Sequence, residues 1–238
     1  METIIVGVIG LLIGSFLTAA GLRLPAKQSI VYPPSACPFC SARLRPWNLV
    51  PVFSYVWQFG RCTRCRERIS PIYPAGELAF AVLAVASYYI FGWSMELAAA
   101  LLFSAMLVMI TVSDLRYMVI PDRILLVFSV PIALVRLTVA PLDPWWDAAA
   151  GSAGGFLLLF AAAVVSRGGL GGGDVKLYAV VGLMLGFSGM LLSLAAASIL
   201  GLCAGLAGVF MNKWGRKTEI PFGPFIAAGA LLVYFAGA

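Results

Sequence analysis

Long stretches without a charged side chain constrain this chain more than any other feature. The longest covers residues 177–212, which is 36 positions without Asp, Glu, Lys or Arg. Charged residues make up only 11% of the whole sequence, whereas soluble domains carry about 25%. So few charges do not cover a water-exposed surface, and in lipid a helix satisfies its own backbone hydrogen bonds. We therefore expect an all-α integral membrane protein.

The uncharged runs predict eight transmembrane helices, because one crossing needs about 17 to 25 apolar residues. The longest run is too long for one crossing at about 1.5 Å rise per residue, so we expect a turn at 186–189 to divide it. The first run lacks the basic start of a cleaved signal peptide, since Glu2 is the only charge before Arg23. Besides the two halves of 177–212, the predicted spans are residues 3–22, 78–93, 97–113, 124–140, 148–166 and 220–238.

The basic residues are distributed unevenly over this predicted topology. If the amino terminus lies outside, 15 of the 16 Lys and Arg residues fall in or beside cytoplasmic loops, and only Arg136 lies near the outer face. Cytoplasmic loops of membrane proteins carry such an excess of positive charge. Both termini are therefore predicted outside, with Asp114, Asp122 and Asp174 at the cytoplasmic rim. The isoelectric point of about 9.2 follows from this bias and does not indicate a nucleic-acid partner.

The one long polar segment, residues 23–76, contains two CxxC pairs, CPFC at 37–40 and CTRC at 62–65. Paired CxxC turns with a gap of this length favour a structural Zn²⁺ held by four thiolates. A disulfide is less favoured in a cytoplasmic segment, and a catalytic zinc is less favoured because four thiolates leave no open position. The predicted zinc ligands are Cys37, Cys40, Cys62 and Cys65.

These features divide the chain into three regions. Residues 1–22 are predicted as the first transmembrane helix, residues 23–76 as a cytoplasmic Cys₄ zinc-binding segment, and residues 77–238 as a seven-helix membrane domain. The polar segment carries eight Arg or Lys residues and little material for a core of its own. A bound metal would therefore stabilise its fold.

Two aspartates at the ends of predicted spans suggest chemistry, since charged residues at such positions are costly and often functional. Asp114 ends the third span, where the helix dipole disfavours an anion. Asp174 lies just before the sixth span and follows five glycines in residues 168–173. Capping, with Lys176 as a counter-charge, would explain this aspartate but not the glycines. Asp122 follows a proline at the start of the fourth span, where a structural capping role is favoured.

The sequence contains no histidine, so the commonest general base is absent and carboxylates are the natural substitute. Two carboxyl groups that share a proton can act together, because one activates water while the other polarises a carbonyl. We therefore predict a catalytic pair of Asp114 and Asp174 at one membrane depth. The glycines beside Asp174 would let an extended peptide approach the backbone.

Five motifs together resemble the bacterial type IV prepilin peptidases, in matching order over nearly the whole chain. They are IGSFL…RLP, the paired CxxC, SDLRYMVIPD, GGGDVKLYAVVGLMLG and EIPFGPFIAAGA. The resemblance implies an intramembrane aspartic endopeptidase of the GxGD type, with Asp114 and Asp174 as its catalytic aspartates. It implies removal of short basic leader peptides from prepilins or pseudopilins at the cytoplasmic face of the bacterial inner membrane. Many members then methylate the new amino terminus with S-adenosylmethionine.

Two details depart from the family pattern. Thr18 stands where members often have Asn, and the stretch SPIYPAGELAF is looser than the usual Arg–Tyr–Pro–x–x–Glu–Leu form, although Glu77 is in place. Both departures leave the expected protease intact. The resemblance also suggests that the zinc-binding segment supports the methylating activity.

Two other classes of protein fit part of the sequence. A polytopic transporter could use membrane aspartates and glycine-broken helices, but it would place polar residues near mid-span and show internal repeats. A membrane scaffold stabilised by zinc would need the cysteines but gives no reason for Asp114. A nucleotide-binding loop is disfavoured, because no Lys-Ser or Lys-Thr pair closes the glycine stretch.

Overall fold

The computed structural model describes residues 1–166, 169–211 and 220–237. Residues 167–168, 212–219 and 238 lie outside the described residues. These positions include the start of the glycine stretch, the ends of two predicted spans and several basic residues on which the predicted orientation depends. Across the described ranges the regular structure is helical, with no strand and only two isolated β-bridges in the cysteine segment. The predicted all-α class is therefore confirmed.

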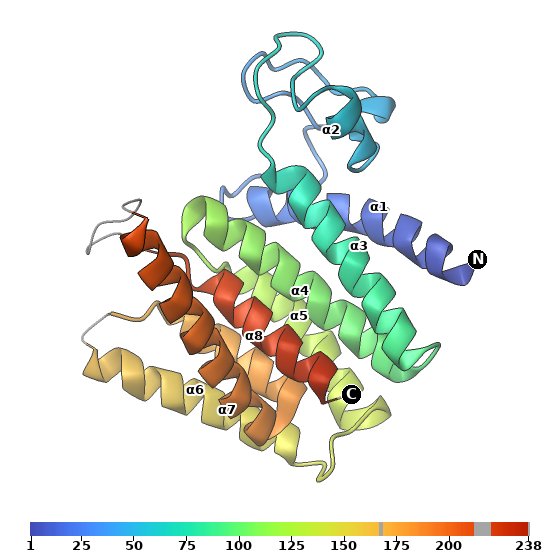
Figure 1. Ribbon diagram of the computed structural model, residues 1–238. Helices are drawn as coiled ribbons and strands as arrows, with labels where there is room; N and C mark the ends of the chain where they lie inside the picture. Colours follow the sequence, from blue (N-terminus) through green and yellow to red (C-terminus); the bar gives the residue numbers. More distant parts are fainter. Residues whose placement is uncertain (167–168, 212–219, 238) are drawn as a thin grey trace.

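Five of the described helices are long and apolar enough to cross a membrane: α1, α3, α4, α6 and α7. Helix α8 is apolar but shorter. Figure 1 shows these helices in a bundle, with α2 and the loops around it standing at one end. The elements are α1 (Glu2–Arg23), the 3-10 turn η1 (Pro46–Leu49), α2 (Phe53–Trp57), α3 (Ile72–Phe91), α4 (Met95–Tyr117), α5 (Asp122–Leu134), the π-helical turn η2 (Val135–Val139), α6 (Asp147–Val165), α7 (Gly172–Phe210) and α8 (Gly223–Ala236).

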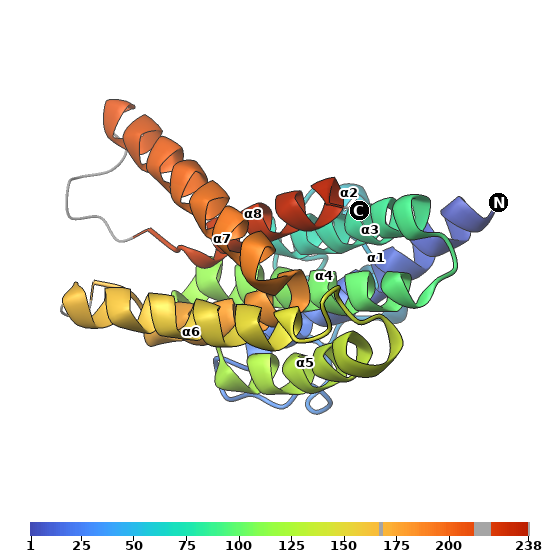
Figure 2. The same cartoon turned by 90° about the horizontal axis from the view of Figure 1, so that it is seen from below.

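Glycines with positive φ form two breaks between helices. Gly92, at φ 58°, ends α3, and Ser94 caps α4 directly after it. Gly186, at φ 74°, interrupts α7 at the start of the predicted turn, in a conformation that residues with a Cβ rarely adopt. The carboxylate of Asp147 accepts a hydrogen bond of 3.1 Å from the Phe187 N–H, which the break leaves without a helical partner. Figure 2 shows the two halves of α7 running in different directions.

Small residues let the helices of two pairs approach closely. Gly151 of α6 and Gly182 of α7 face each other so closely that a Cβ on either one would overlap the backbone of the other helix. Between α1 and α3, a Cβ on Gly14 would lie 2.9 Å from the carbonyl oxygen of Glu77. Close contacts of this kind are a common basis of helix association in membranes.

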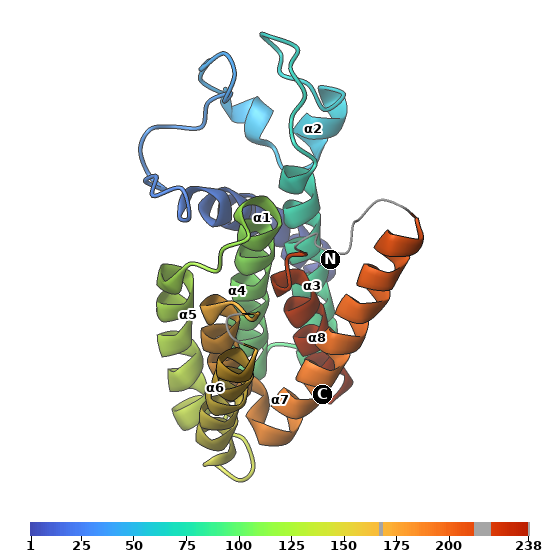
Figure 3. The same cartoon turned by 90° about the vertical axis from the view of Figure 1, so that its left-hand side faces the viewer.

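Helix α4 lies at the centre of the bundle and contacts α1, α3, α5 and α8 (Figure 3). Its side chains Phe103, Met106 and Ile110 are fully buried. This packing fixes α4 against its neighbours and, with it, the position of Asp114 in the last turn of the helix.

Candidate active site and metal centre

Asp114 is buried although it lies at the end of a helix, and only 6% of the residue is exposed. The helix ends one turn later at Met118, which adopts the left-handed conformation. The Oδ2 atom of Asp114 accepts a hydrogen bond of 2.7 Å from the backbone N–H of Gly223, the first residue of α8. Within the described residues no Lys or Arg forms an ion pair with Asp114.

Asp174 lies in the first turn of α7, at the same end of the bundle as Asp114. The start of α7 packs against the segment that follows α4, since a Cβ on Gly173 would lie 2.8 Å from Cβ of Ile120. A Cβ on Gly171 would lie 3.0 Å from Oδ2 of Asp174, so this carboxylate lies against its own loop. One turn further along α7, Tyr178 is fully buried, and its hydroxyl has no hydrogen-bond partner among the described residues. The two predicted catalytic residues thus lie at the same end of the bundle.

The glycines before Asp174 differ in their surroundings. A Cβ on Gly172 would have no heavy atom within 4 Å, whereas a Cβ on Gly173 would lie 2.8 Å from Cβ of Ile120. Neither glycine has a positive φ. Close packing therefore accounts for Gly173, while Gly172 leaves open space beside the backbone.

Lys176 does not balance Asp174. It donates hydrogen bonds of 2.8 and 2.7 Å to the two carboxylate oxygens of Asp122, in the first turn of α5. Asp122 is the first residue of α5 and Pro121 holds the N-cap position, so Asp122 contributes a favourable charge at the helix amino terminus. Both side chains of this pair are more than half exposed, and exposed pairs contribute little to stability.

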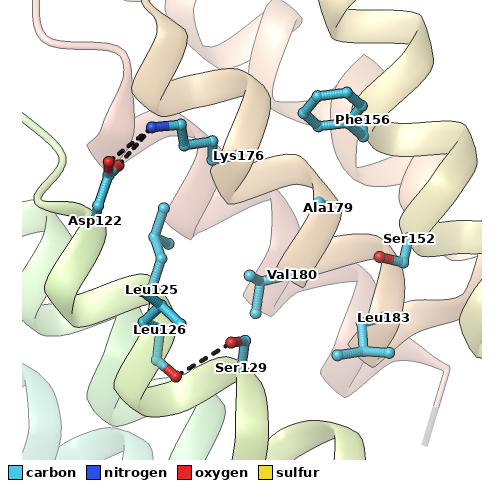
Figure 4. A pocket seen from close by; sticks show the side chains of 10 residues that line it. All are labelled: Asp122, Leu125, Leu126, Ser129, Ser152, Phe156, Lys176, Ala179, Val180 and Leu183. Atoms are coloured by element: carbon cyan, nitrogen blue, oxygen red, sulfur yellow. Dashed lines mark hydrogen bonds and ion pairs between the residues drawn. The ribbon is translucent and has the colours of Figure 1, made fainter.

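A groove with a volume of about 430 Å³ lies between α5, α6 and α7. Figure 4 shows the Asp122–Lys176 pair at one end and apolar side chains, among them Leu126 and Phe156, along the walls. The α7 residues that line it are Lys176, Ala179, Val180 and Leu183. Because an α-helix repeats every 3.6 residues, these positions lie on the face of α7 opposite to Asp174. The groove is therefore separate from the two carboxylates.

The four cysteines of the segment 23–76 form one cluster, as predicted. Their sulfur atoms all lie within 4.8 Å of one another and could hold a metal ion such as zinc. The sulfurs of Cys37 and Cys65 are 3.8 Å apart. That is close to the edge of a tetrahedron whose zinc–sulfur bonds are about 2.3 Å long.

Both CxxC turns have the same backbone geometry. In the first, the Cys37 N–H donates to the carbonyl oxygen of Ala42 at 3.0 Å, and the Ser41 N–H donates to that of Cys37 at 2.9 Å. Cys62 and Arg66 make the corresponding bonds in the second turn. Ser41 and Arg66 both have a positive φ. Two copies of one turn therefore present their thiols to a common point.

Backbone N–H groups favour the thiolate at Cys62. Those of Cys65 and Arg64 lower the pKa of the Cys62 thiol to about 6. At Cys65 the N–H of Glu67 acts in the same direction, but desolvation and the neighbouring sulfurs outweigh it and raise the pKa of that thiol to about 12. One thiolate thus opposes ionisation of the next, and a bound divalent cation removes this conflict.

Glu77 links the cysteine segment to the membrane helices. Its residue is only 8% exposed, and its carboxylate accepts hydrogen bonds of 2.7 Å from the Ser15 hydroxyl of α1 and from the Val52 N–H. Val52 precedes α2 and has a φ of 62°, which is rare for a β-branched residue. The carboxylate therefore joins α1, α3 and the cysteine segment at one point.

Sequence reasoning missed a second carboxylate with specific partners on α4, and this one is about a quarter exposed, with 28% of its side chain accessible. Glu96, in the first turn, accepts hydrogen bonds of 2.8 and 2.7 Å from the guanidinium of Arg136 and one of 2.6 Å from the Tyr234 hydroxyl. Arg136 is only 4% exposed. Arg136 is predicted near the outer face, and Glu96 directly precedes the predicted span 97–113 at that same face, so opposite charges at one depth are the signal for this pair. Sequence reasoning also did not predict the hydrogen bond between Gly223 and Asp114, because the motif EIPFGPFIAAGA gives no indication of a partner for Gly223.

Comparison with known proteins identifies the family of the chain. The model of the Bacterial Peptidase A24 N-terminal domain matches residues 8–91, and that of the Type IV leader peptidase family matches residues 101–206. The prepilin leader peptidase/N-methyltransferase of Bacillus subtilis is 41% identical over 230 residues, which cover 97% of this chain and 92% of the relative. The chain belongs to the type IV leader peptidase family.

Other relatives match the chain at lower identity. The prepilin leader peptidase/N-methyltransferases of Burkholderia pseudomallei (strain K96243) and Pseudomonas aeruginosa are 34% and 30% identical to it. They match over 90% and 96% of this chain and over 71% and 88% of their own lengths. No solved structure matches the chain significantly. The first family model covers the cysteine segment, and the second covers both aspartates but ends before α8.

Proposed function

We propose that this chain is an intramembrane aspartic endopeptidase that removes leader peptides from type IV prepilins or pseudopilins. The proposal depends mainly on one observation: in a member of the leader peptidase family, Asp114 in the last turn of α4 and Asp174 in the first turn of α7 lie at the same end of the bundle. Across the described ranges neither carboxylate forms an ion pair, so both are free to exchange protons. A transporter or scaffold is not favoured, because neither class accounts for the family match.

Peptide hydrolysis by such a pair needs one carboxylate and one carboxylic acid. The carboxylate takes a proton from water as the water oxygen bonds to the scissile carbonyl carbon, and the acid gives its proton to the carbonyl oxygen. When the carbon–nitrogen bond breaks, the leaving nitrogen takes the proton held by the first group. A hydroxyl proton returns to the second group, so both side chains end as they began.

The proposed topology has eight membrane crossings, with the two halves of α7 counted separately. Residues 1–22 form the first crossing, residues 23–76 the cytoplasmic zinc-binding segment, and residues 77–238 a seven-helix membrane domain. The bias of basic residues supports an active site facing the cytoplasm of the bacterial inner membrane and both termini outside. A basic leader would lie in the cytoplasm, and the apolar helix that follows it would lie in lipid.

The cysteine cluster supports a structural Zn²⁺ held by Cys37, Cys40, Cys62 and Cys65, because the sulfur spacing fits four tetrahedral ligands. Four thiolates leave no open position, so the metal would fold the segment rather than hydrolyse peptides. The names of the relatives support a second activity, N-methylation, for which S-adenosylmethionine would supply the methyl group. Glu77 would hold the folded segment against α1 and α3.

The direct test incubates the purified protein with a prepilin, with and without S-adenosylmethionine, and measures product masses. We expect loss of the leader in both cases and one added methyl group only with the methyl donor. The Asp114→Asn protein serves as the control for contaminating proteases. An intact prepilin after incubation with folded protein contradicts the peptidase, whereas a cleaved but unmethylated product contradicts only the second activity.

A further inference from the structure

Helix α8 contacts the candidate catalytic pair through Gly223. Its N–H donates the buried hydrogen bond of 2.7 Å to Asp114, across 109 positions of sequence. Gly223 lies beyond residues 101–206, which the second family model matches. In the proposed hydrolysis α8 has no assigned role, although this helix contacts one of the two carboxylates.

The first turn of α8 has a single free donor. The first N–H groups of a helix have no partner within it, but Pro224 has no N–H. The N–H groups of the next two residues bond to the Phe222 carbonyl oxygen at 3.0 and 3.1 Å. The N–H of Gly223 remains, and it points to the carboxylate. The positive end of the helix dipole lies at the same place.

Glycine at position 223 is required for space. A Cβ there would lie 2.8 Å from Oδ2 of Asp114 and 3.1 Å from its Cβ and Cγ. The φ of Gly223 is not positive, so backbone freedom is not the reason for glycine. Any side chain would push the carboxylate and α8 apart.

We infer that the amino end of α8 positions Asp114 through the Gly223 N–H and holds it as the carboxylate that takes the proton from water. Asp174 is then the acid that gives its proton to the carbonyl oxygen. A hydrogen bond to a charged acceptor is stronger than one to a neutral acceptor, and two close carboxyl groups do not both ionise readily. The inference rests on the proposed peptidase function, and Gly223 is a positioning residue in it.

The first test compares two glycines of the same helix. A Cβ on Gly229 would lie 2.8 Å from the backbone nitrogen of Ala197 and the carbonyl oxygen of Ser193, so it is as crowded as Gly223 but away from Asp114. Gly223→Ala should lower kcat for prepilin cleavage by about 100-fold with KM nearly unchanged, because small displacements of a catalytic group cost about that much. Gly229→Ala should keep kcat within about threefold when rates are normalised to folded protein.

The second test removes the donor without adding volume. Glycolic acid incorporated at position 223 by a suppressor tRNA replaces the N–H by an ester oxygen. The acid limb of the pH–kcat profile should then move to higher pH by about one unit, because the ionised Asp114 loses a hydrogen bond. The same ester at Gly229 should leave the acid limb in place. If Gly223→Ala does not fold, the ester variant still tests whether the Gly223 N–H acts on Asp114.

The outcomes separate this inference from the peptidase itself. Normal kcat and an unmoved acid limb in the Gly223 variants, with a wild-type protein that cleaves prepilin, would overturn the role of α8 alone. Equal losses in Gly223→Ala and Gly229→Ala with an unmoved acid limb would also overturn it, because displacement of the helix would then explain the loss. A folded wild-type protein without cleavage would instead overturn the proposed function.

Discussion

The two ends of α4 hold carboxylates in different ways. At its start, Glu96 is bound by the Arg136 guanidinium through two hydrogen bonds and by the Tyr234 hydroxyl of α8. At its end, Asp114 accepts a hydrogen bond from the backbone of α8 and, within the described residues, has no cation. Both contacts join α4 to α8, but only one of them compensates a full charge.

This difference suggests that the charge on Glu96 stabilises the structure, whereas the charge on Asp114 is available for proton transfer. Removing either partner of a buried ion pair leaves an uncompensated charge, so a proton transfer at Glu96 would weaken the packing of three elements. Asp114 keeps a fixed orientation through one neutral donor, and a proton can come and go without breaking an ion pair. The partners of the two carboxylates therefore indicate which of them can exchange a proton.

The largest effect on activity is expected when the acid–base function at the carboxyl end of α4, or that of its partner Asp174, is removed. Asp114→Asn and Asp174→Asn keep the shape of the side chain but cannot cycle a proton, so each should reduce cleavage by about 10³-fold or more. Thermal unfolding and membrane insertion should stay close to wild type. Substantial cleavage by either variant, measured by product mass, would contradict the catalytic pair.

At the other end the expected loss is in stability. Glu96→Ala leaves the Arg136 side chain, 5% exposed, without its counter-ion, and should lower the free energy of unfolding by about 3 kcal/mol, the lower end of the range for broken buried pairs. The double variant Glu96→Leu/Arg136→Leu should recover much of this loss. Unfolding in detergent measures both, and kcat of the folded fraction should change little. If Glu96→Ala lowers kcat but leaves the stability unchanged, Glu96 is not a purely structural carboxylate and the distinction from Asp114 is wrong.

The sequence predicted one end of α4 better than the other, for physical reasons. Asp114 stands out because a charge at the carboxyl end of an apolar helix has no capping explanation, and the cysteines stand out because each turn brings two ligands together locally. The contacts of Asp114 with Gly223, of Lys176 with Asp122, and of Glu77 with Val52 depend on which segments pack side by side. Hydropathy does not contain that information.

The predicted span 124–140 shows a second limit. Its residues form α5, with Pro131 inside it, followed by the π-helical turn η2, which carries the buried Arg136. Counting apolar residues predicts the length of such a segment but not the change in its hydrogen-bond pattern. The π-helical turn carries the Arg136 guanidinium, which bonds to Glu96.

The cysteine cluster would hold negative charge in a third way, with a metal instead of an arginine. Cys37→Ser/Cys62→Ser should lose most of the zinc, against about one zinc per chain in the parent. Methyl transfer should suffer at least as much as cleavage, because the carboxylates lie on other elements. Metal analysis of protein purified under reducing conditions measures the first effect. A parent without zinc would contradict the metal centre, and zinc loss with normal methylation would contradict its link to that activity.

The retention of zinc should also depend on pH. Backbone N–H groups lower the pKa of the Cys62 thiol to about 6, so its thiolate is present above that value and is lost as the pH falls through it. Zinc should therefore be released to a chelator increasingly as the pH falls, since protons compete for the thiolate ligands. Release that does not change between pH 7 and pH 5 would contradict a thiolate site.

The smallest effect is expected at Asp122, which lies at the same end of the bundle as Asp114 but forms an exposed pair with Lys176. Asp122→Asn should change the free energy of unfolding by less than about 1 kcal/mol, the usual range for such pairs, and cleavage by only a few-fold. Lys176→Gln should have a similar effect, and the double variant should add little to either. The chemical change equals that in Asp114→Asn, so only burial and partners differ between the two experiments. A loss at Asp122 as deep as at Asp114 would mean that an exposed carboxylate takes part in the reaction, and the groove beside it would then belong to the active site.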